Sequence, residues 1–179
     1  MSRHRGLVCV NACGMALLGF VAVQLLSAGT AQAEDKEPFA VFEFGAAGDW
    51  GLNNGGSSFG PTAAVEFTPI KNWLVIETGV TALLSRGQTE WGTDFVFKKP
   101  FDLSPNIEFE PGIGPVWIHT TRGGRTTDAI GAAFVLDFMV WPTPDRKYGW
   151  FFEPSYTYSF SRDHEQSLSV SVGLLIPIQ

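Results

Sequence analysis

The chain has little cysteine, and what it has lies near its start. Cys9 and Cys13 are the two cysteines of the 179-residue sequence, and both fall within an N-terminal stretch that carries export signals. If that stretch is removed, no thiol remains for a disulfide, a zinc cluster or a nucleophile. Cysteine chemistry is therefore excluded from the predicted mature protein.

Residues 1–33 have the features of a secretory signal peptide. Arg3, His4 and Arg5 form a basic start, an apolar run rich in Ala, Leu and Val follows, and Ala31-Gln32-Ala33 forms a small-x-small cleavage site. The apolar run is short for the alternative, an N-terminal transmembrane anchor. We therefore predict a signal peptide over residues 1–33 and a single mature domain over residues 34–179.

Basic residues are also scarce. The sequence has 12 Lys and Arg against 18 Asp and Glu, and removal of the predicted signal peptide takes away two arginines and no acid. This balance argues against nucleic acid as a partner. Apolar residues with helical spacing are absent as well, whereas Gly and aromatic residues are frequent, which favours an all-β class.

The sequence is instead rich in alternation with a period of two. In the last stretch, Leu168, Val170, Val172 and Leu174 alternate with serine or glycine, so that a strand there has one apolar and one small polar face. Eight such stretches follow one another from residue 38 to 178, and each allows the roughly 9–11 residues that a tilted strand needs to cross a bilayer. They predict an eight-stranded antiparallel up-and-down transmembrane β-barrel whose apolar face contacts lipid.

The predicted connections are of two kinds. Those after the second, fourth and sixth strands contain proline and cover residues 69–72, 100–106 and 142–145. The others are polar and mostly glycine-rich, and cover residues 49–60, 85–88, 120–127 and 161–165. A barrel with both termini in the periplasm has short periplasmic turns and looser outer loops. We therefore expect the proline turns in the periplasm and the glycine-rich loops outside the cell.

Tryptophans are expected at the two boundaries between lipid and water, where membrane barrels concentrate aromatic side chains. Their positions place Trp50, Trp91 and Trp117 at the outer strand ends, and Trp73, Trp141 and Trp150 at the inner ones. The alternative, that aromatic residues simply favour strand ends, stays open at this point.

With a signal peptide, eight alternating strands and two kinds of connection, residues 38–179 resemble the small outer-membrane β-barrel proteins typified by the OmpA transmembrane domain and OmpX. The resemblance is one of architecture, carried by patterns such as Phe109-Glu110-Pro111, Phe152-Glu153-Pro154 and residues 167–178. It implies a monomer in the outer membrane of a Gram-negative bacterium, with an envelope-structural or surface-interaction role, no enzyme activity and no cofactor.

Charged residues that the pattern turns into the lumen form the first candidate site. The set is acidic apart from one lysine, and consists of Glu43, Glu66, Glu77, Asp94, Lys98, Glu108, Glu110, Asp137 and Glu153. An eight-stranded barrel is just wide enough to be filled by side chains, so the simplest expectation is a hydrogen-bonded plug. The surplus of carboxylates leaves a narrow cation-preferring pore or a divalent-cation site as alternatives.

Arginines of the predicted outer loops form the second candidate site. They are Arg86, Arg122, Arg125 and Arg162. Guanidinium groups pair well with phosphates, so we expect contact with outer-membrane lipids and lipopolysaccharide. Ordinary solvated loop charges are the alternative.

Two further functions remain open from the sequence. Some small barrels of the resembled type deacylate lipid A, and that chemistry needs a His-x-Ser arrangement near a carboxylate. The nearest match is His119-Thr120-Thr121, with threonine in place of serine. The other function is a soluble periplasmic lipocalin-like carrier, whose apolar faces would point inward. Against it, small residues such as Gly45 and Gly79 lie on the charged face, as befits a crowded lumen.

Overall fold

The computed structural model describes residues 38–53 and 55–178. The predicted signal peptide and both cysteines lie outside the described residues. The strands are β1 Ala40–Gly51, β2 Ser57–Ile70, β3 Leu74–Ser85, β4 Gln88–Lys98, β5 Phe101–Ser104, β6 Ile107–Arg122, β7 Arg125–Val140, β8 Gly149–Ser159 and β9 Gln166–Ile178. Within the described ranges, no helix is long and apolar enough to cross a membrane.

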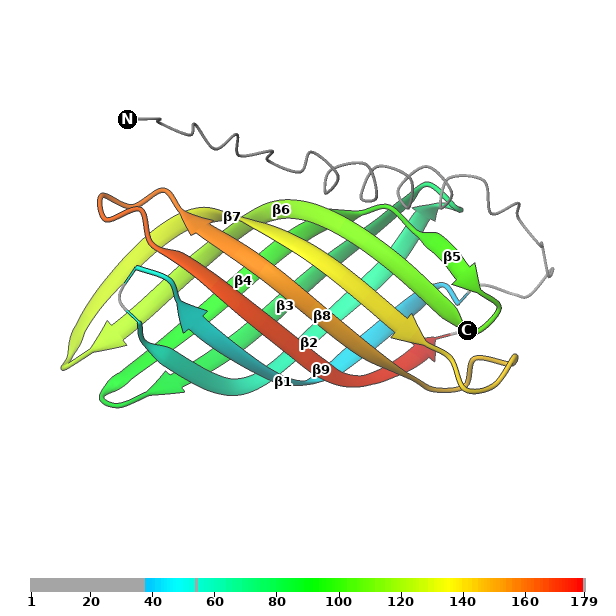
Figure 1. Cartoon of the computed structure of the whole chain (residues 1–179), viewed down its shortest axis with the longest axis horizontal. Coiled ribbons are helices and arrows are strands. Elements are labelled where there is room, and N and C mark those ends of the chain that lie inside the picture. Colours follow the sequence, from blue (N-terminus) through cyan, green and yellow to red (C-terminus); the bar gives the residue numbers. More distant parts are fainter. Residues whose placement is uncertain (1–37, 54, 179) are drawn as a thin grey trace, which may run out of the picture. The chain divides into compact units, whose positions relative to one another are not determined.

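The strands close into a barrel. Apart from β4 and β5, neighbours in the chain pair antiparallel, β1 pairs with β9, and β4 pairs with β6. The short β5 continues the line of β4 along β6, because Phe97 lies opposite Ile113 and Phe101 lies opposite Phe109. The two segments together form one wall, so the barrel has eight strands, and the predicted fold class is confirmed (Figure 1).

The wall formed by β4 and β5 is interrupted at residues 99–100. Pro100 has no amide hydrogen to give to the ladder, whereas the Lys99 amide still donates to the Pro111 carbonyl at 2.9 Å. The strand then resumes at Phe101, and the chain turns only at residues 105–106. The prediction of a turn over all of residues 100–106 is therefore wrong for residues 101–104.

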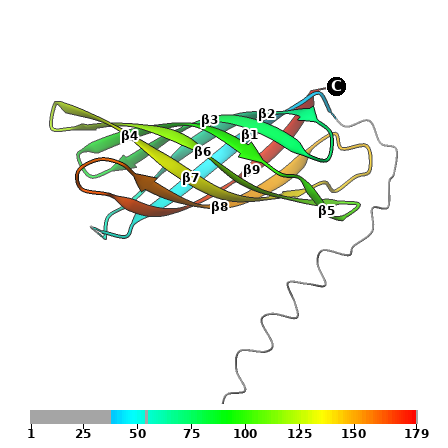
Figure 2. The ribbon, with the colours of Figure 1, turned by 90° about the horizontal axis from the view of Figure 1, so that it is seen from above.

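Both barrel termini lie at one end, which we call the terminal end, together with the connections at residues 71–73, 105–106 and 141–148. The opposite, distal end holds the connections at residues 52–56, 86–87, 123–124 and 160–165 (Figures 1 and 2). This division is the one that the two kinds of connection predict.

Several connections differ in length from the predicted ones. The expected loops over residues 49–60 and 120–127 are shorter, because their flanking strands extend further. Gly123 and Gly124 have φ angles of 56° and 78°, the left-handed conformation that a two-residue hairpin turn requires. Moreover, the longest connection, at residues 141–148, lies at the terminal end, where short turns are expected.

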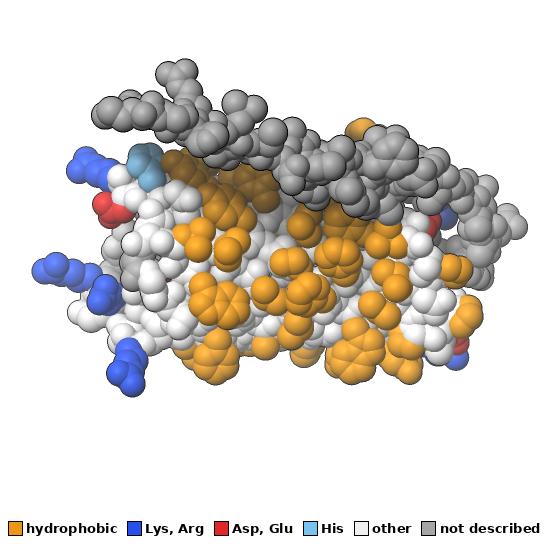
Figure 3. All heavy atoms as spheres, in the orientation of Figure 1, with side chains coloured by type: hydrophobic (Ala, Val, Ile, Leu, Met, Phe, Trp, Pro, Cys, Tyr) orange, Lys and Arg blue, Asp and Glu red, His pale blue; other side chains and the backbone are white. Residues whose placement is uncertain are grey.

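The two faces of the wall have opposite chemistry. Exposed phenylalanines on the outer face include Phe42, Phe44, Phe95, Phe134 and Phe152, and Figure 3 shows apolar side chains spread over the middle of the barrel with basic ones at the distal end. A lipocalin-like carrier would hold these rings inside. Their exposure overturns that alternative.

Five of the six tryptophans, at positions 50, 73, 91, 117 and 150, are about half exposed, as aromatic side chains at a lipid boundary are. Trp141 is only 1 % exposed, so its predicted place in the inner aromatic belt is wrong. Its side chain lies in the lumen, in a buried apolar cluster with Met139.

Candidate functional site

Lys98 is the centre of a buried ion cluster in the lumen. Its ammonium nitrogen donates to Glu66 Oε1 at 2.6 Å and to Asp137 Oδ2 at 2.9 Å. It also forms ion pairs with Glu77 and, at 3.4 Å, with Glu153. Buried charges of opposite sign at these distances attract each other strongly, since little water screens them. The lysine thereby ties four strands of the barrel together, β2, β3, β7 and β8, from its place on β4.

Two local features place the cluster. Glu66 and Glu77 lie directly opposite each other on β2 and β3, a like-charged pair that needs a cation between its members. On the other side of Lys98, Gly112 is the cross-strand partner on β6. A Cβ on Gly112 would lie only 2.8 Å from Lys98 Cγ, so the glycine leaves the space through which the lysine stem passes.

Carboxyl groups outnumber the ammonium. Glu43 and Glu110 are buried as well, Glu110 opposite Asp137, which brings six carboxyl groups into the lumen around one lysine. Four of the six, Glu43, Glu66, Glu77 and Asp137, offer oxygens within 4.8 Å of one another, a spacing that suits a metal ion. Lys98 contacts three of these four, however, so its ammonium stands where such an ion would.

An apolar plug closes the lumen toward the terminal end. It consists of Val41, Met139, Trp141, Phe151 and Leu175. The two-residue alternation along the strands is enough to place Val41, Met139, Phe151 and Leu175 inward, so the sequence pattern could have predicted most of the plug. Trp141 could not be found in this way, because it follows the end of its strand.

Glu108 belongs to this plug rather than to the Lys98 cluster. Its Oε2 accepts a hydrogen bond of 2.8 Å from Trp141 Nε1, and its Oε1 accepts one of 2.7 Å from Arg146. The Arg146 guanidinium also lies 5.5 Å from the centre of the Trp141 ring, within cation–π range. The connection at residues 141–148 is thus held over the mouth of the barrel. Sequence reasoning missed Arg146.

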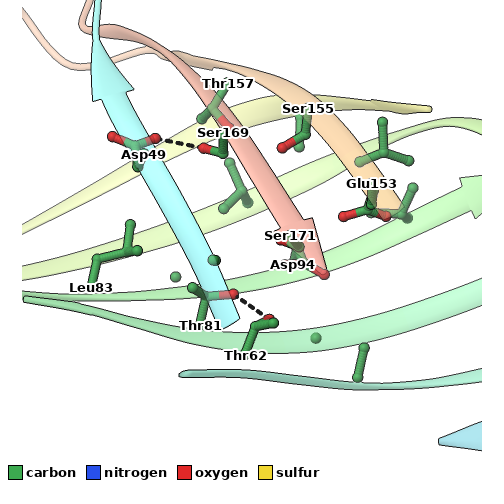
Figure 4. A pocket seen from close by; sticks show the side chains of 18 of the residues that line it. Asp49, Thr62, Thr81, Leu83, Asp94, Glu153, Ser155, Thr157, Ser169 and Ser171 are labelled. Atoms are coloured by element: carbon green, nitrogen blue, oxygen red, sulfur yellow. Dashed lines mark hydrogen bonds between the residues drawn. The ribbon is translucent and has the colours of Figure 1, made fainter. Parts of the chain in front are cut away.

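On the distal side of the Lys98 cluster lies a cavity of about 110 Å³ whose lining is part polar and part apolar. Its acidic residues include Glu43, Glu77, Asp94 and Glu153, and hydroxyl side chains come from β2, β3, β8 and β9. Apolar side chains such as Val96, Val116 and Phe151 complete the lining. Figure 4 shows two hydrogen-bonded pairs in this wall, Thr62 with Thr81 and Asp49 with Ser169. Asp94 therefore faces the cavity, and the nine predicted lumen residues occupy three levels.

The four predicted surface arginines lie together at the distal end. Arg86 is in the connection at residues 86–87, Arg122 and Arg125 flank the turn at residues 123–124, and Arg162 is in the connection at residues 160–165. All four are exposed, and none forms an ion pair with a described residue.

The two histidines of the distal end have other partners. His119 Nδ1 lies 2.8 Å from Asp128 Oδ1, and His164 Nδ1 lies 3.0 Å from the Tyr158 hydroxyl. Thr120, the middle residue of the deacylase-like match, donates to Glu90 at 3.1 Å. Among the described residues, neither histidine is hydrogen-bonded to a serine or threonine hydroxyl.

No protein-family model matches the chain, and no curated protein sequence does either. Solved structures do match. Neisserial surface protein A superposes with a TM-score of 0.64 at 14% identity, over 78% of this chain and 96% of that one. Ail, the attachment invasion locus protein of Yersinia pestis, gives 0.54 at 11% identity, over 79% and 99%.

The N-terminal β-barrel domain of Pseudomonas aeruginosa OprF gives a TM-score of 0.53 at 10% identity, over 79% of this chain and 100% of that one. At such identities the likeness concerns the fold. It extends over nearly the full length of each of these barrels, and over the strands described above. The chain thus has the fold of the small eight-stranded outer-membrane β-barrels, the group typified by the OmpA transmembrane domain and OmpX.

Proposed function

We propose that the chain is a non-enzymatic, monomeric barrel of the Gram-negative outer membrane, exported by a cleaved signal peptide, whose distal end binds the phosphates of lipopolysaccharide. The observation that carries the proposal is the set of four exposed arginines, none ion-paired with a described residue, at one end of an apolar-walled barrel. In this orientation the terminal end faces the periplasm and the distal end faces outside.

The chemistry of the arginines supports a phosphate ligand. A guanidinium group presents a fork of N–H donors that fits phosphate oxygens in pairs. Because Arg122 and Arg125 face each other across a two-residue turn, two such forks lie side by side. Ail, a protein of the same fold, has been solved in complex with the heparin analogue sucrose octasulfate, so another barrel of this fold binds a polyanion.

The histidine environment favours a binding role over lipid A deacylation. A serine-type mechanism needs a histidine that takes the proton of a hydroxyl nucleophile. Asp128 holds His119 through Nδ1, as a triad carboxylate would, but threonine stands where the match requires serine. Among the described residues, no serine or threonine hydroxyl is hydrogen-bonded to His119, so the deacylase alternative lacks a nucleophile at this site.

A narrow cation-preferring pore is the second candidate, and the surplus of lumen carboxylates favours it. Two closures lie in its path, the Lys98 cluster and the apolar plug around Trp141. The pore candidate therefore requires both to open, whereas the binding role requires no change of the barrel.

The first experiment locates the protein. The full-length chain is expressed in a Gram-negative host, the outer membrane is isolated, and the fraction is run on a gel with and without boiling. A membrane barrel migrates differently until it is boiled. Recovery as a soluble periplasmic protein without a shift would contradict the membrane part of the proposal.

The second experiment tests the ligand. Binding of the purified barrel to lipopolysaccharide is compared with binding by a variant in which Arg86, Arg122, Arg125 and Arg162 are all changed to Gln. We expect the variant to lose most of its affinity. A matched variant with Lys at the four positions keeps the charge without the fork and should fall between the two. Equal affinity of wild type and Gln variant counts against the proposal.

A further inference from the structure

Two acidic side chains of the distal cavity lie on one row around the barrel. Glu43 on β1 is opposite Ala64 on β2, Ala64 is opposite Gly79 on β3, and Gly79 is opposite Asp94 on β4. The two carboxylates are therefore separated by two strands whose inward side chains on that row are a methyl group and a hydrogen. This is how the cavity arises between them.

Asp94 uses the gap. A Cβ built on Gly79 would lie 2.8 Å from Asp94 Oδ1 and 3.2 Å from Asp94 Oδ2. The carboxylate thus occupies the space over Gly79 where any other residue would place its side chain, and it lies across β3. Glu43 lines the same cavity from β1.

Both carboxylates have an oxygen without a partner. Glu43 Oε1 and Asp94 Oδ1 are buried atoms that form no hydrogen bond with any described residue, and Glu43 as a whole is only 3 % exposed. The other acids of the lining differ. Glu77 and Glu153 also have a buried oxygen without a hydrogen bond, but both form ion pairs with Lys98. Asp49 accepts a bond from Ser169, and Glu90 accepts one from Thr120. A buried carboxylate oxygen with no partner is costly, and a positively charged ligand at Glu43 and Asp94 would offset that cost.

We propose that a divalent metal ion of the calcium type binds in this cavity, between the carboxylates of Glu43 and Asp94. Calcium takes six to eight oxygen ligands, including carboxylates and water. The Thr62 and Thr81 hydroxyls, one hydrogen-bonded pair in the same wall, supply further oxygens. About 110 Å³ holds an ion together with several waters. The site shares Glu43 with the four-carboxylate group, whose other three members, Glu66, Glu77 and Asp137, all contact Lys98.

Calcium binding to the full chain, purified in zwitterionic detergent free of lipopolysaccharide, tests the proposal by isothermal titration calorimetry. One saturable site is expected. Asp94→Asn and Glu43→Gln should each weaken it by about tenfold or more, because affinity follows the number of charged ligands. Asp102→Asn removes an exposed carboxylate near the terminal end and should leave the affinity unchanged.

The Gly79→Ala variant distinguishes calcium binding at a defined site from non-specific attraction of calcium to negative charge. It keeps every carboxylate but forces that of Asp94 to move, so it should weaken calcium binding while Asp102→Asn does not. Equal affinity in wild type, Asp94→Asn and Gly79→Ala overturns the proposal, and so does the absence of saturable binding. A heat-dependent gel shift for each variant shows that it is folded, and Asp94→Asn keeps the test decisive if Glu43→Gln does not fold. The outcome is independent of the arginine-to-glutamine experiment.

Discussion

Lys98 and Asp137 meet at 2.9 Å inside the barrel although their strands, β4 and β7, are not neighbours but are separated by β6. Both side chains are excluded from solvent. Asp137 therefore depends on Lys98 for its counter-charge, and Lys98 depends on Asp137 and the other carboxylates of the cluster.

Lys98→Met should destabilise the barrel by about 3–5 kcal/mol, because removing one partner leaves buried carboxylates without a counter-charge. Urea unfolding in detergent, followed by tryptophan fluorescence, measures the loss. Lys147→Met, which breaks an exposed pair with Asp145, is the control and should change little. Adding Asp137→Asn to Lys98→Met should recover part of the loss. A Lys98→Met variant as stable as the wild type would show that the ion pairs of Lys98 do not stabilise the folded barrel.

Trp141→Ala should cost about 3–5 kcal/mol, as large-to-small changes at buried aromatic sites do. Trp150→Ala, at an exposed position of the neighbouring strand, is the matched control in the same assay. If both substitutions cost the same, Trp141 does not lie in the plug as the structure has it.

Glu108→Gln should loosen the connection at residues 141–148, because the carboxylate binds both Trp141 and Arg146. Bonds to a charged acceptor are stronger than those to a neutral amide. Limited trypsin digestion of the folded barrel reads this out as faster cleavage after Arg146 or Lys147. The Asp102→Asn variant should be cleaved at the wild-type rate. An unchanged cleavage rate for Glu108→Gln would show that Glu108 does not hold this connection in place.

Conduction should require both closures to be removed. In planar bilayers, Lys98→Ala and Trp141→Ala should each leave conductance near the wild-type level, and the double variant should raise it, because two barriers in series must both fall. High conductance in either single variant would show that only one closure blocks the lumen. High conductance in the wild type would favour the pore as the primary function.

Inward glycines differ in what they tolerate. A Cβ on Gly114 would run into the backbone carbonyl of Phe95, whereas a Cβ on Gly92 has nothing within 4 Å. Gly114→Ala should therefore destabilise the barrel by about 1–3 kcal/mol through overpacking, and Gly92→Ala should remain within about 0.5 kcal/mol of the wild type. Urea midpoints of the two variants provide the comparison. Equal midpoints would mean that the backbone shifts at Gly114 and accommodates the added methyl group at little cost.

Much of this structure could be predicted from the two-residue period. Parity places Glu66, Glu77 and Asp137 inside because lipid and lumen impose opposite polarity on successive side chains. It also places Lys98 among them. Parity carries no information on height within the lumen, however, and for this reason Glu108 could not be separated from the Lys98 cluster before the register was seen.

The remaining misses occur where strands end. Trp141 and Arg146 follow β7, beyond the last ladder pair, so their direction depends on the path of the connection and on Glu108. The turn at Gly123 and Gly124 was expected as a loop because glycine signals a turn without fixing its length. The cavity beside Asp94 depends on which residues face each other across four strands, a property of the pairing rather than of any one segment.

The seam between β1 and β9 has a consequence for the time course of assembly. The pairs from Ala40 with Ile178 to Gly51 with Ser167 join the beginning of the barrel to its end, so the ring cannot close until β9 has been synthesised. Loop-closure entropy must be overcome before such distant pairs form, and folds dominated by them form slowly. Until then β1 presents an unpaired edge, which is prone to join another chain. The barrel therefore depends on protection between synthesis and insertion, and its final strand sets when that dependence ends.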